Sequence, residues 1–230
     1  MYFSKNFTKA EFVHRPNRFK ACVLIEGQEV IVHVPNTGRC KEILLPGTKV
    51  ILREENNPKR KTGYDLIGGY KGDRFINIDS QIPNKVVHEA LLNGKVKHLE
   101  DFKKIEREKT YGRSRLDFKL TADDGYEYYL EIKGVTLEED GIAKFPDAPT
   151  ERGRKHLLEL IEIKKSGLGA GVLFLIQMDG VRYFTPNKEM DKHFCDALRQ
   201  AYENKVDIFA YDCTLGEDFI TLKSRVDIIL

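Results

Sequence analysis

Residues 114–120 read Ser-Arg-Leu-Asp-Phe-Lys-Leu, and residues 128–133 read Tyr-Tyr-Leu-Glu-Ile-Lys. In both segments apolar and polar side chains alternate, which is the pattern of a β-strand with one buried face. Asp123-Asp124-Gly125 lies between them and predicts a tight turn. A three-residue loop with Gly125 last, in the left-handed conformation, places Asp117 directly across from Glu131. The two segments therefore predict a β-hairpin in a fixed register.

The alternation also assigns faces to the two strands. We expect Leu116, Phe118 and Leu120 on one face of the first strand, opposite Arg115, Asp117 and Lys119. On the second strand we expect Tyr128, Leu130 and Ile132 opposite Tyr129, Glu131 and Lys133. If the apolar sets face one core, Asp117 and Glu131 must lie on the same side of the sheet.

This pattern suggests a chemistry. Two neighbouring carboxylates repel each other, and a bound divalent cation removes that penalty. Lys133 lies on the same strand face as Glu131 and can reach the water or phosphate that reacts. One class of metal-dependent nucleases builds its active site in this way. The alternative is an ordinary half-exposed hairpin with cross-strand charge pairs.

The composition limits the protein class. The chain has 230 residues, of which 41% are hydrophobic and 32% charged, as in a globular protein with one large or two small domains. No apolar run approaches the roughly 20 residues that span a bilayer, and the first residues lack a signal-peptide segment. The four cysteines are scattered, which argues against zinc and disulfides. We therefore expect a cytoplasmic protein with no membrane partner.

The charge is unevenly distributed along the chain. Its net charge is only +2, but residues 1–80 carry 14 Lys and Arg against 9 Asp and Glu. Residues 81–230 carry 24 against 27. A basic first part beside a mildly acidic part with clustered carboxylates suits phosphate binding next to a metal site.

The secondary-structure pattern changes near Gln81. The preceding residues predict five short strands, which suggest a small closed barrel such as an OB-fold. After Pro83 the pattern predicts, in order, a helix over residues 84–93, the hairpin, a helix from Thr150, a buried strand over residues 171–178 and a helix over residues 190–202. This order describes a mixed sheet with helices on both faces. The predicted fold class is α/β with an all-β N-terminal part, and the predicted domains are residues 1–80 and 81–230.

Longer sequence motifs resemble the sugar fermentation stimulation protein A family. The resemblance runs along most of the chain, and its motifs are far more specific than the Asp–Glu–Lys set. They include Arg15-Pro16-Asn17-Arg18-Phe19, Val32-His33-Val34-Pro35-Asn36-Thr37-Gly38-Arg39, Glu131-Ile132-Lys133-Gly134-Val135, Phe145-Pro146-Asp147-Ala148 and Thr150-Glu151-Arg152-Gly153. The resemblance implies an OB-fold followed by a restriction-endonuclease-like, PD-(D/E)xK, domain. It also implies DNA binding and a regulatory role in sugar metabolism.

These observations define the candidate site residues. We predict Asp117, Glu131 and Lys133 as catalytic and Mg²⁺ or Mn²⁺ as the cofactor. Asp117 and Glu131 would bind it, and Glu89 is the acidic residue on the preceding helix that could complete the metal site. The nucleic-acid-binding candidates are Arg15, Arg18, Arg39, Lys41, Arg115, Arg152 and His156. Phe19 and Tyr64 are either base-stacking platforms or, as we favour, barrel core.

Two functions fit this set of residues. The first is a Mg²⁺-dependent phosphodiesterase, that is, a nuclease, acting on nucleic acid and most readily on DNA. The second is a DNA-binding module that keeps the nuclease scaffold without turnover. An intact Asp117–Glu131–Lys133 set favours the first function, and a mispositioned set favours the second.

Overall fold

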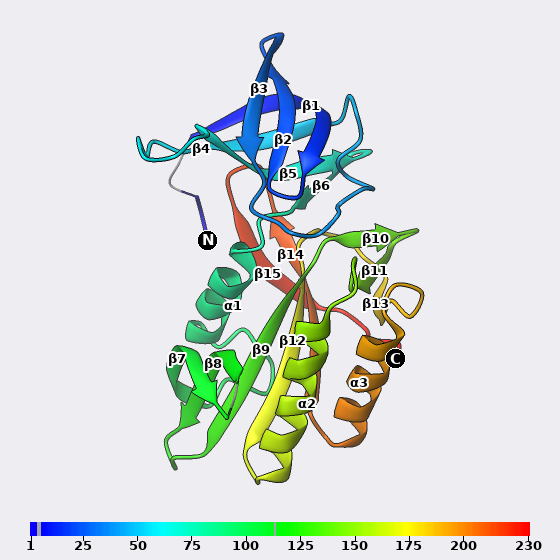
Figure 1. Cartoon of the computed structure of the whole chain (residues 1–230). Coiled ribbons are helices and arrows are strands. Elements are labelled where there is room, and N and C mark those ends of the chain that lie inside the picture. The colour runs from blue at the N-terminus through cyan, green and yellow to red at the C-terminus, as the bar shows by residue number, and fades with distance from the viewer. Residues whose placement is uncertain (4–5, 113) are drawn as a thin grey trace.

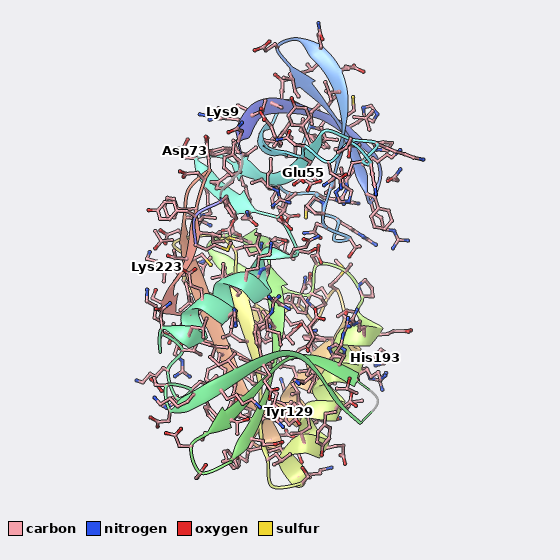
Figure 2. The ribbon with its side chains drawn as sticks, turned by 90° about the vertical axis from the view of Figure 1, so that its left-hand side faces the viewer. Lys9, Glu55, Asp73, Tyr129, His193 and Lys223 are labelled. Carbon is pink, nitrogen blue, oxygen red and sulfur yellow. The ribbon has the colours of Figure 1, made fainter. Side chains whose placement is uncertain are left out.

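The structure is a computed structural model that describes residues 1–3, 6–112 and 114–230. Figure 1 shows two parts stacked end to end, with β1–β6 in the upper part and the remaining elements in the lower part. Figure 2 shows the same arrangement from the side, with Glu55 in the upper part and Tyr129 on the sheet of the lower part. The chain passes from one part to the other just before helix α1.

The first part is a closed β-barrel. Its strands are β1 (Phe7–Asn17), β2 (Lys20–Ile25), β3 (Gln28–His33), β4 (Lys49–Glu54), β5 (Tyr64–Lys71) and β6 (Arg74–Asn77). They pair in the order β3-β2-β1-β4-β5-β6, and an additional β3–β5 pairing closes the sheet. The barrel agrees with the sequence prediction. Strand β1 was not predicted, because it buries only Ala10 and Phe12 and most of its other side chains are polar or charged.

The second part is a mixed sheet with helices. Its main sheet has the order β15-β14-β12-β9-β8-β7, in which β9, β12 and β14 run parallel and the other pairs antiparallel. A small sheet of β10, β11 and β13 lies beside it. The elements are α1 (Ile82–Leu92), β7 (Phe102–Tyr111), β8 (Ser114–Ala122), β9 (Glu127–Val135), β10 (Leu137–Glu139), β11 (Ile142–Phe145), α2 (Glu151–Lys165), β12 (Gly169–Ile176), β13 (Tyr183–Pro186), α3 (Lys192–Glu203), β14 (Asp207–Leu215) and β15 (Ile220–Arg225).

Helices cover both faces of the main sheet, as predicted. All eight residues of β12 are buried, because alternate side chains enter two different cores. Leu173 and Leu175 pack in the cluster that contains α1 side chains, whereas Val172 and Phe174 pack in the cluster that contains α2 and α3 side chains. Helix α1 therefore lies on one face of the sheet, and α2 and α3 lie on the other (Figure 1).

The two parts share buried contacts. One buried cluster includes Val34 and Ile78 from the first part together with residues of the main sheet. The Gln177 amide, just after β12, donates to the Asn77 side chain at 2.9 Å, and the Asn77 N–H donates to the Gln177 carbonyl at 3.0 Å. Residues 1–3 also lie against the second part, where the Phe3 N–H donates to the Asp218 carbonyl. The junction is therefore a packed interface.

No helix in the described ranges is long and apolar enough to cross a membrane.

Candidate active site

The hairpin of β8 and β9 has the predicted register. Paired residues run from Thr121–Glu127 to Phe118–Leu130. Gly125 has φ +86°, in the left-handed region that a glycine tolerates at the end of a three-residue loop. Pairing between β8 and β9 ends at Phe118–Leu130. The next pair in this register would be Asp117 and Glu131, so both carboxylates lie where the two strands part.

The Asp117 side chain lies in the gap between the strands. Its Oδ2 accepts a hydrogen bond from the backbone N–H of Ile132 at 2.8 Å. Its Oδ1 accepts one from the Asn84 amide at 2.7 Å. Asn84 lies in the first turn of α1, so this helix and the neighbouring strand fix the carboxylate from two sides.

The predicted apolar face of β8 needs one correction. Phe118 and Leu120 pack in the cluster that contains α1 side chains, as expected, but Leu116 packs in the other cluster, with Tyr129 and α2. Leu116 pairs with Lys109 of β7, beyond the end of the pairing with β9. A two-stranded ribbon twists more strongly than a wide sheet, so simple alternation no longer predicts which core a side chain enters.

Glu131 is buried and has two unlike oxygens. Only 3% of the residue is exposed. Its Oε1 accepts hydrogen bonds from Lys133 at 2.6 Å and from Nδ1 of His156 on α2. Its Oε2 is also buried, and it accepts no hydrogen bond from any residue that the structure describes. A buried carboxylate oxygen without a partner is costly, so this atom is suited to a ligand.

Burial acts on the two carboxylates with different outcomes. Burial and the nearby Glu131 charge raise the pKa of Asp117, and its hydrogen bonds from Ile132 and Asn84 offset this only in part. Burial alone would also raise the pKa of Glu131, but the hydrogen bond from His156 and the charge of Lys133 lower it. The lowered pKa of Glu131 favours its ionised form, and the negative charge of Glu131 disfavours ionisation of Asp117.

This donor set fits a hard divalent cation. Within residues 1–3, 6–112 and 114–230, no three His, Cys, Asp or Glu side chains are grouped to hold a metal ion. Mg²⁺ does not need such a group, because it keeps several of its waters and binds proteins through one or two carboxylates. The free Oε2 of Glu131 and the Asp117 carboxylate supply oxygen ligands of this type. The residues present therefore fit Mg²⁺ or Mn²⁺ better than zinc.

Glu89 is not brought to this site. Its carboxylate binds the amino group of Met1 at 2.8 Å and is half exposed. The α1 residue that reaches Asp117 is Asn84, and five residues of helix place Glu89 roughly 140° around the axis from it. The prediction of Glu89 as a metal ligand is therefore wrong in this geometry. Pro83 in the first turn marks where α1 begins, but which side of α1 faces Asp117 depends on how the helix packs on the sheet.

Two predicted nucleic-acid contacts have other roles in the structure. The Arg15 guanidinium donates to four backbone carbonyls, those of Arg18, Asn36, Gly38 and Arg39. It therefore organises the loops around it and has little capacity left for phosphate. His156 is buried and binds Glu131, so it belongs to the carboxylate site.

The remaining basic candidates lie on the surface. Arg18, Arg39 and Lys41 are exposed around one groove of the barrel. Arg115 is exposed on β8 and lies 3.6 Å from Glu108. Arg152 is exposed in the first turn of α2, where Thr150 is the N-cap. Exposed Arg and Lys side chains of this kind are available for backbone phosphates.

The two aromatic candidates differ from each other. Tyr64 is partly buried and packs against the core, as we favoured. Phe19 is 50% exposed in the turn between β1 and β2, so the favoured core role is wrong for it. Its residue type resembled a core position, but it follows Asn17 and Arg18 in a turn that points away from the barrel interior.

Comparison with known proteins covers both parts of the chain. Residues 13–78 match the family model of the SfsA N-terminal OB domain, and residues 81–219 match that of the sugar fermentation stimulation protein RE domain. The sugar fermentation stimulation protein homologs of Clostridium tetani and Clostridium kluyveri are 66% and 64% identical over 230 residues, the full length of each chain.

A solved structure also matches the whole chain. The structure of Pyrococcus furiosus SfsA in complex with Ca²⁺ has a TM-score of 0.90 and 27% identity, with full coverage of both chains. This likeness confirms the predicted fold class, an OB-fold barrel followed by a mixed sheet with helices. The matches to both parts and the full-length homologs show that the chain belongs to the sugar fermentation stimulation protein family.

Proposed function

We propose that this chain is a divalent-metal-dependent phosphodiesterase that acts on nucleic acid, most readily DNA. The observation that carries the proposal is the buried Oε2 of Glu131, which lacks a hydrogen bond from the described residues and lies beside Asp117 where β8 and β9 part. The Pyrococcus furiosus relative was solved with Ca²⁺, which supports a divalent-cation site. Mg²⁺ or Mn²⁺ is the cofactor we propose.

Each residue has a defined task in this proposal. When bound, the cation supplies an activated water and neutralises charge on the phosphate. Asp117 holds the cation, and the Ile132 and Asn84 hydrogen bonds fix its carboxylate. Glu131 offers Oε2 as a ligand while Oε1 stays bound to Lys133 and His156. His156 is thus a positioning residue.

Lys133 is the residue that we place next to the reacting phosphate. Its ammonium group is held 2.6 Å from Glu131 Oε1, and its side chain is 13% exposed. From there it can donate to a phosphate oxygen or orient the attacking water, which stabilises charge in the transition state. The surface residues Arg18, Arg39, Lys41, Arg115 and Arg152 would hold the nucleic-acid backbone. We assign cleavage to residues 81–230 and most of the backbone binding to residues 1–80.

The second candidate function is DNA binding without turnover. It is favoured by the placement of Glu89, because the helix that precedes the hairpin does not bring an acidic residue to Asp117. A binding module of this kind would suit the regulatory role in sugar metabolism that the relatives' names suggest.

A cleavage assay distinguishes the two functions. Labelled DNA and RNA, single- and double-stranded, are incubated with the protein and Mg²⁺ or Mn²⁺, and products are resolved by length. We expect cleavage by the wild type, none by Asp117→Asn, and normal cleavage by the matched control Glu89→Gln. If the wild type cleaves nothing with either metal, the binding function is supported. Equal activity in wild type and Asp117→Asn would indicate a contaminating nuclease.

A further inference from the structure

A basic groove runs along the barrel. It has a volume of about 480 Å³ and is lined by twelve residues, of which five are basic and none is acidic. The basic residues are His14, Arg15, Arg18, Arg39 and Lys41. In a chain with almost balanced charge, such a groove attracts an anionic polymer. Because the Arg15 guanidinium donates to backbone carbonyls, we expect Arg18, Arg39 and Lys41 to make the direct contacts with phosphates.

A second cleft continues from the groove to the junction of the two parts. It has a volume of about 370 Å³ and shares Arg18, Thr37 and Gly38 with the groove. Its only acidic lining residue is Asp147, whose carboxylate accepts the backbone N–H of Arg39 at 3.1 Å. The cleft and the groove thus adjoin each other at these three shared residues.

The far end of the cleft is formed by residues of the second part. It is lined by Gly134, which directly follows Lys133, and by Thr150. Thr150 caps α2, and six residues of helix, about 9 Å, separate it from His156. The cleft therefore reaches chain neighbours of the carboxylate site, whereas Asp117, Glu131, Lys133 and His156 are not among its described lining residues.

An exposed aromatic ring stands at the start of this path. Phe19 is half exposed, and the Arg18 guanidinium lies 5.6 Å from the centre of its ring. The turn is held in place, because the Phe19 N–H donates to the Asn17 side chain and its carbonyl accepts from Val34. A fixed, solvent-facing ring beside a cation offers a stacking surface for a planar base.

We infer that the groove and the adjoining cleft form one path that binds a single strand of nucleic acid, with one base stacked on Phe19. The inference rests on the proposed function and defines its substrate class as single-stranded nucleic acid. A cleft of about 370 Å³ has the size of a small-ligand pocket, which suits an unpaired nucleotide. Stacking on Phe19 also requires an unpaired base, since paired bases are already stacked on each other.

Binding is tested apart from cleavage. Fluorescence anisotropy of the full-length protein in EDTA is measured with a labelled DNA oligonucleotide, its RNA counterpart and the corresponding DNA duplex. We expect the single strands to bind at least about tenfold tighter than the duplex. Phe19→Ala should weaken single-strand binding by about 5- to 150-fold, which corresponds to the loss of one stacked base. Phe19→Trp should restore it.

The matched control is Tyr202→Ala, which removes another exposed ring, on α3. It should bind like the wild type. Both Phe19 and Tyr202 are exposed, so neither variant endangers folding. Duplex binding as tight as single-strand binding, or Phe19→Ala binding like the wild type, overturns the inference.

The two proposals fail separately. If single strands bind in a Phe19-dependent way but no metal supports cleavage, the path is correct and the phosphodiesterase proposal is wrong. If the wild type cleaves duplex DNA and Phe19→Ala cleaves it equally well, the phosphodiesterase proposal holds and the single-strand path is wrong.

Discussion

Two buried clusters of acidic and basic side chains differ in whether every carboxylate oxygen has a hydrogen-bond or ionic partner. In the barrel, Arg53 lies 2.8 Å from Asp65 and 2.7 Å from Asp79, and Arg60 also binds Asp65. Both oxygens of Asp65 thus have cationic partners. In the second part, Glu131 binds one lysine and one histidine, Asp117 binds only the neutral Asn84 amide and the Ile132 N–H, and Glu131 keeps an oxygen without a hydrogen bond from the described residues.

The pKa of each aspartate reflects this difference. Burial would raise the pKa of Asp65, but hydrogen bonds from Arg60, His33 and Arg53 lower it to about 2. Burial and the Glu131 charge raise the pKa of Asp117. We call a cluster matched when each of its carboxylates is held by cationic partners, as Asp65, Asp79 and Glu55 are by Arg53 and Arg60. Such a cluster stabilises the fold, whereas one that leaves a buried carboxylate oxygen without a partner is prepared to bind a cation. The comparison separates a structural network from a candidate active site.

The largest effect is expected from breaking the matched cluster. Arg53→Met leaves Asp65 and Asp79 buried without their shared partner, which should destabilise the protein by about 3–5 kcal/mol. Urea unfolding followed by circular dichroism measures this. The matched control Lys165→Met removes an exposed ion pair with Glu162 and should cost less than about 1 kcal/mol. A small loss in Arg53→Met would show that the cluster is not structural.

The next effect is on catalysis. Lys133→Ala should lower the cleavage rate by about 10²–10³-fold, because the lysine acts on reacting charge, and urea unfolding checks that the variant stays folded without this partner of Glu131. The double variant with Asp117→Asn should lose little more than either single variant, since the residues act as a unit. Single-turnover cleavage measures both. Additive losses would separate Lys133 from the metal site.

Cation binding should stabilise only the unmatched cluster. At a Mn²⁺ concentration a hundred times its dissociation constant, the wild type should gain about 2.7 kcal/mol of stability. Asp117→Asn should lose this gain, whereas Asp65→Asn, although less stable, should keep it. Thermal unfolding with and without Mn²⁺ gives the comparison. A gain that persists in Asp117→Asn would place the cation elsewhere.

The smallest expected effect is a loss of stability at acidic pH. Since the folded-state pKa of Asp65 lies below its unfolded value, its ionised form stabilises the fold above pH 4, and this contribution disappears as the pH falls towards 2. The loss amounts to about 2 kcal/mol. Asp65→Asn should therefore lose less stability across this range than the wild type. Equal losses in the two proteins would assign acid sensitivity to other carboxylates.

The structural features that depend on a local sequence pattern could be predicted from the sequence. Gly125 and the alternation around it were sufficient for the hairpin register, and the continuous apolar run was sufficient for β12 as a central strand. These features depend on turn geometry and side-chain periodicity, which neighbouring residues determine. The same register brings Asp117 and Glu131 to the position after the last pair, but Asp117 binds Asn84 of α1 and Glu131 binds His156 of α2, which lie on opposite faces of the sheet.

Other features depend on contacts between distant segments. Helix phase relative to the sheet decided that Asn84 rather than Glu89 reaches Asp117. His156 contacts Glu131 only because α2 packs on β9. Arg15 binds backbone carbonyls, and every residue has a carbonyl, so no sequence pattern reveals these partners. The exposure of Phe19 could not be predicted either, because an aromatic residue after a turn fits a core position equally well.

The packed junction has a consequence for chimeric proteins. Gln177 and Asn77 exchange hydrogen bonds across it, and Lys71 and Arg74 both bind Glu138 on the other side. A chimera that takes its barrel from one relative and its sheet from another must inherit these partners as matched sets. A crossover at Gln81 that mismatches them leaves a buried amide or carboxylate without its partner, so the two parts should be exchangeable between relatives only together with their contact residues.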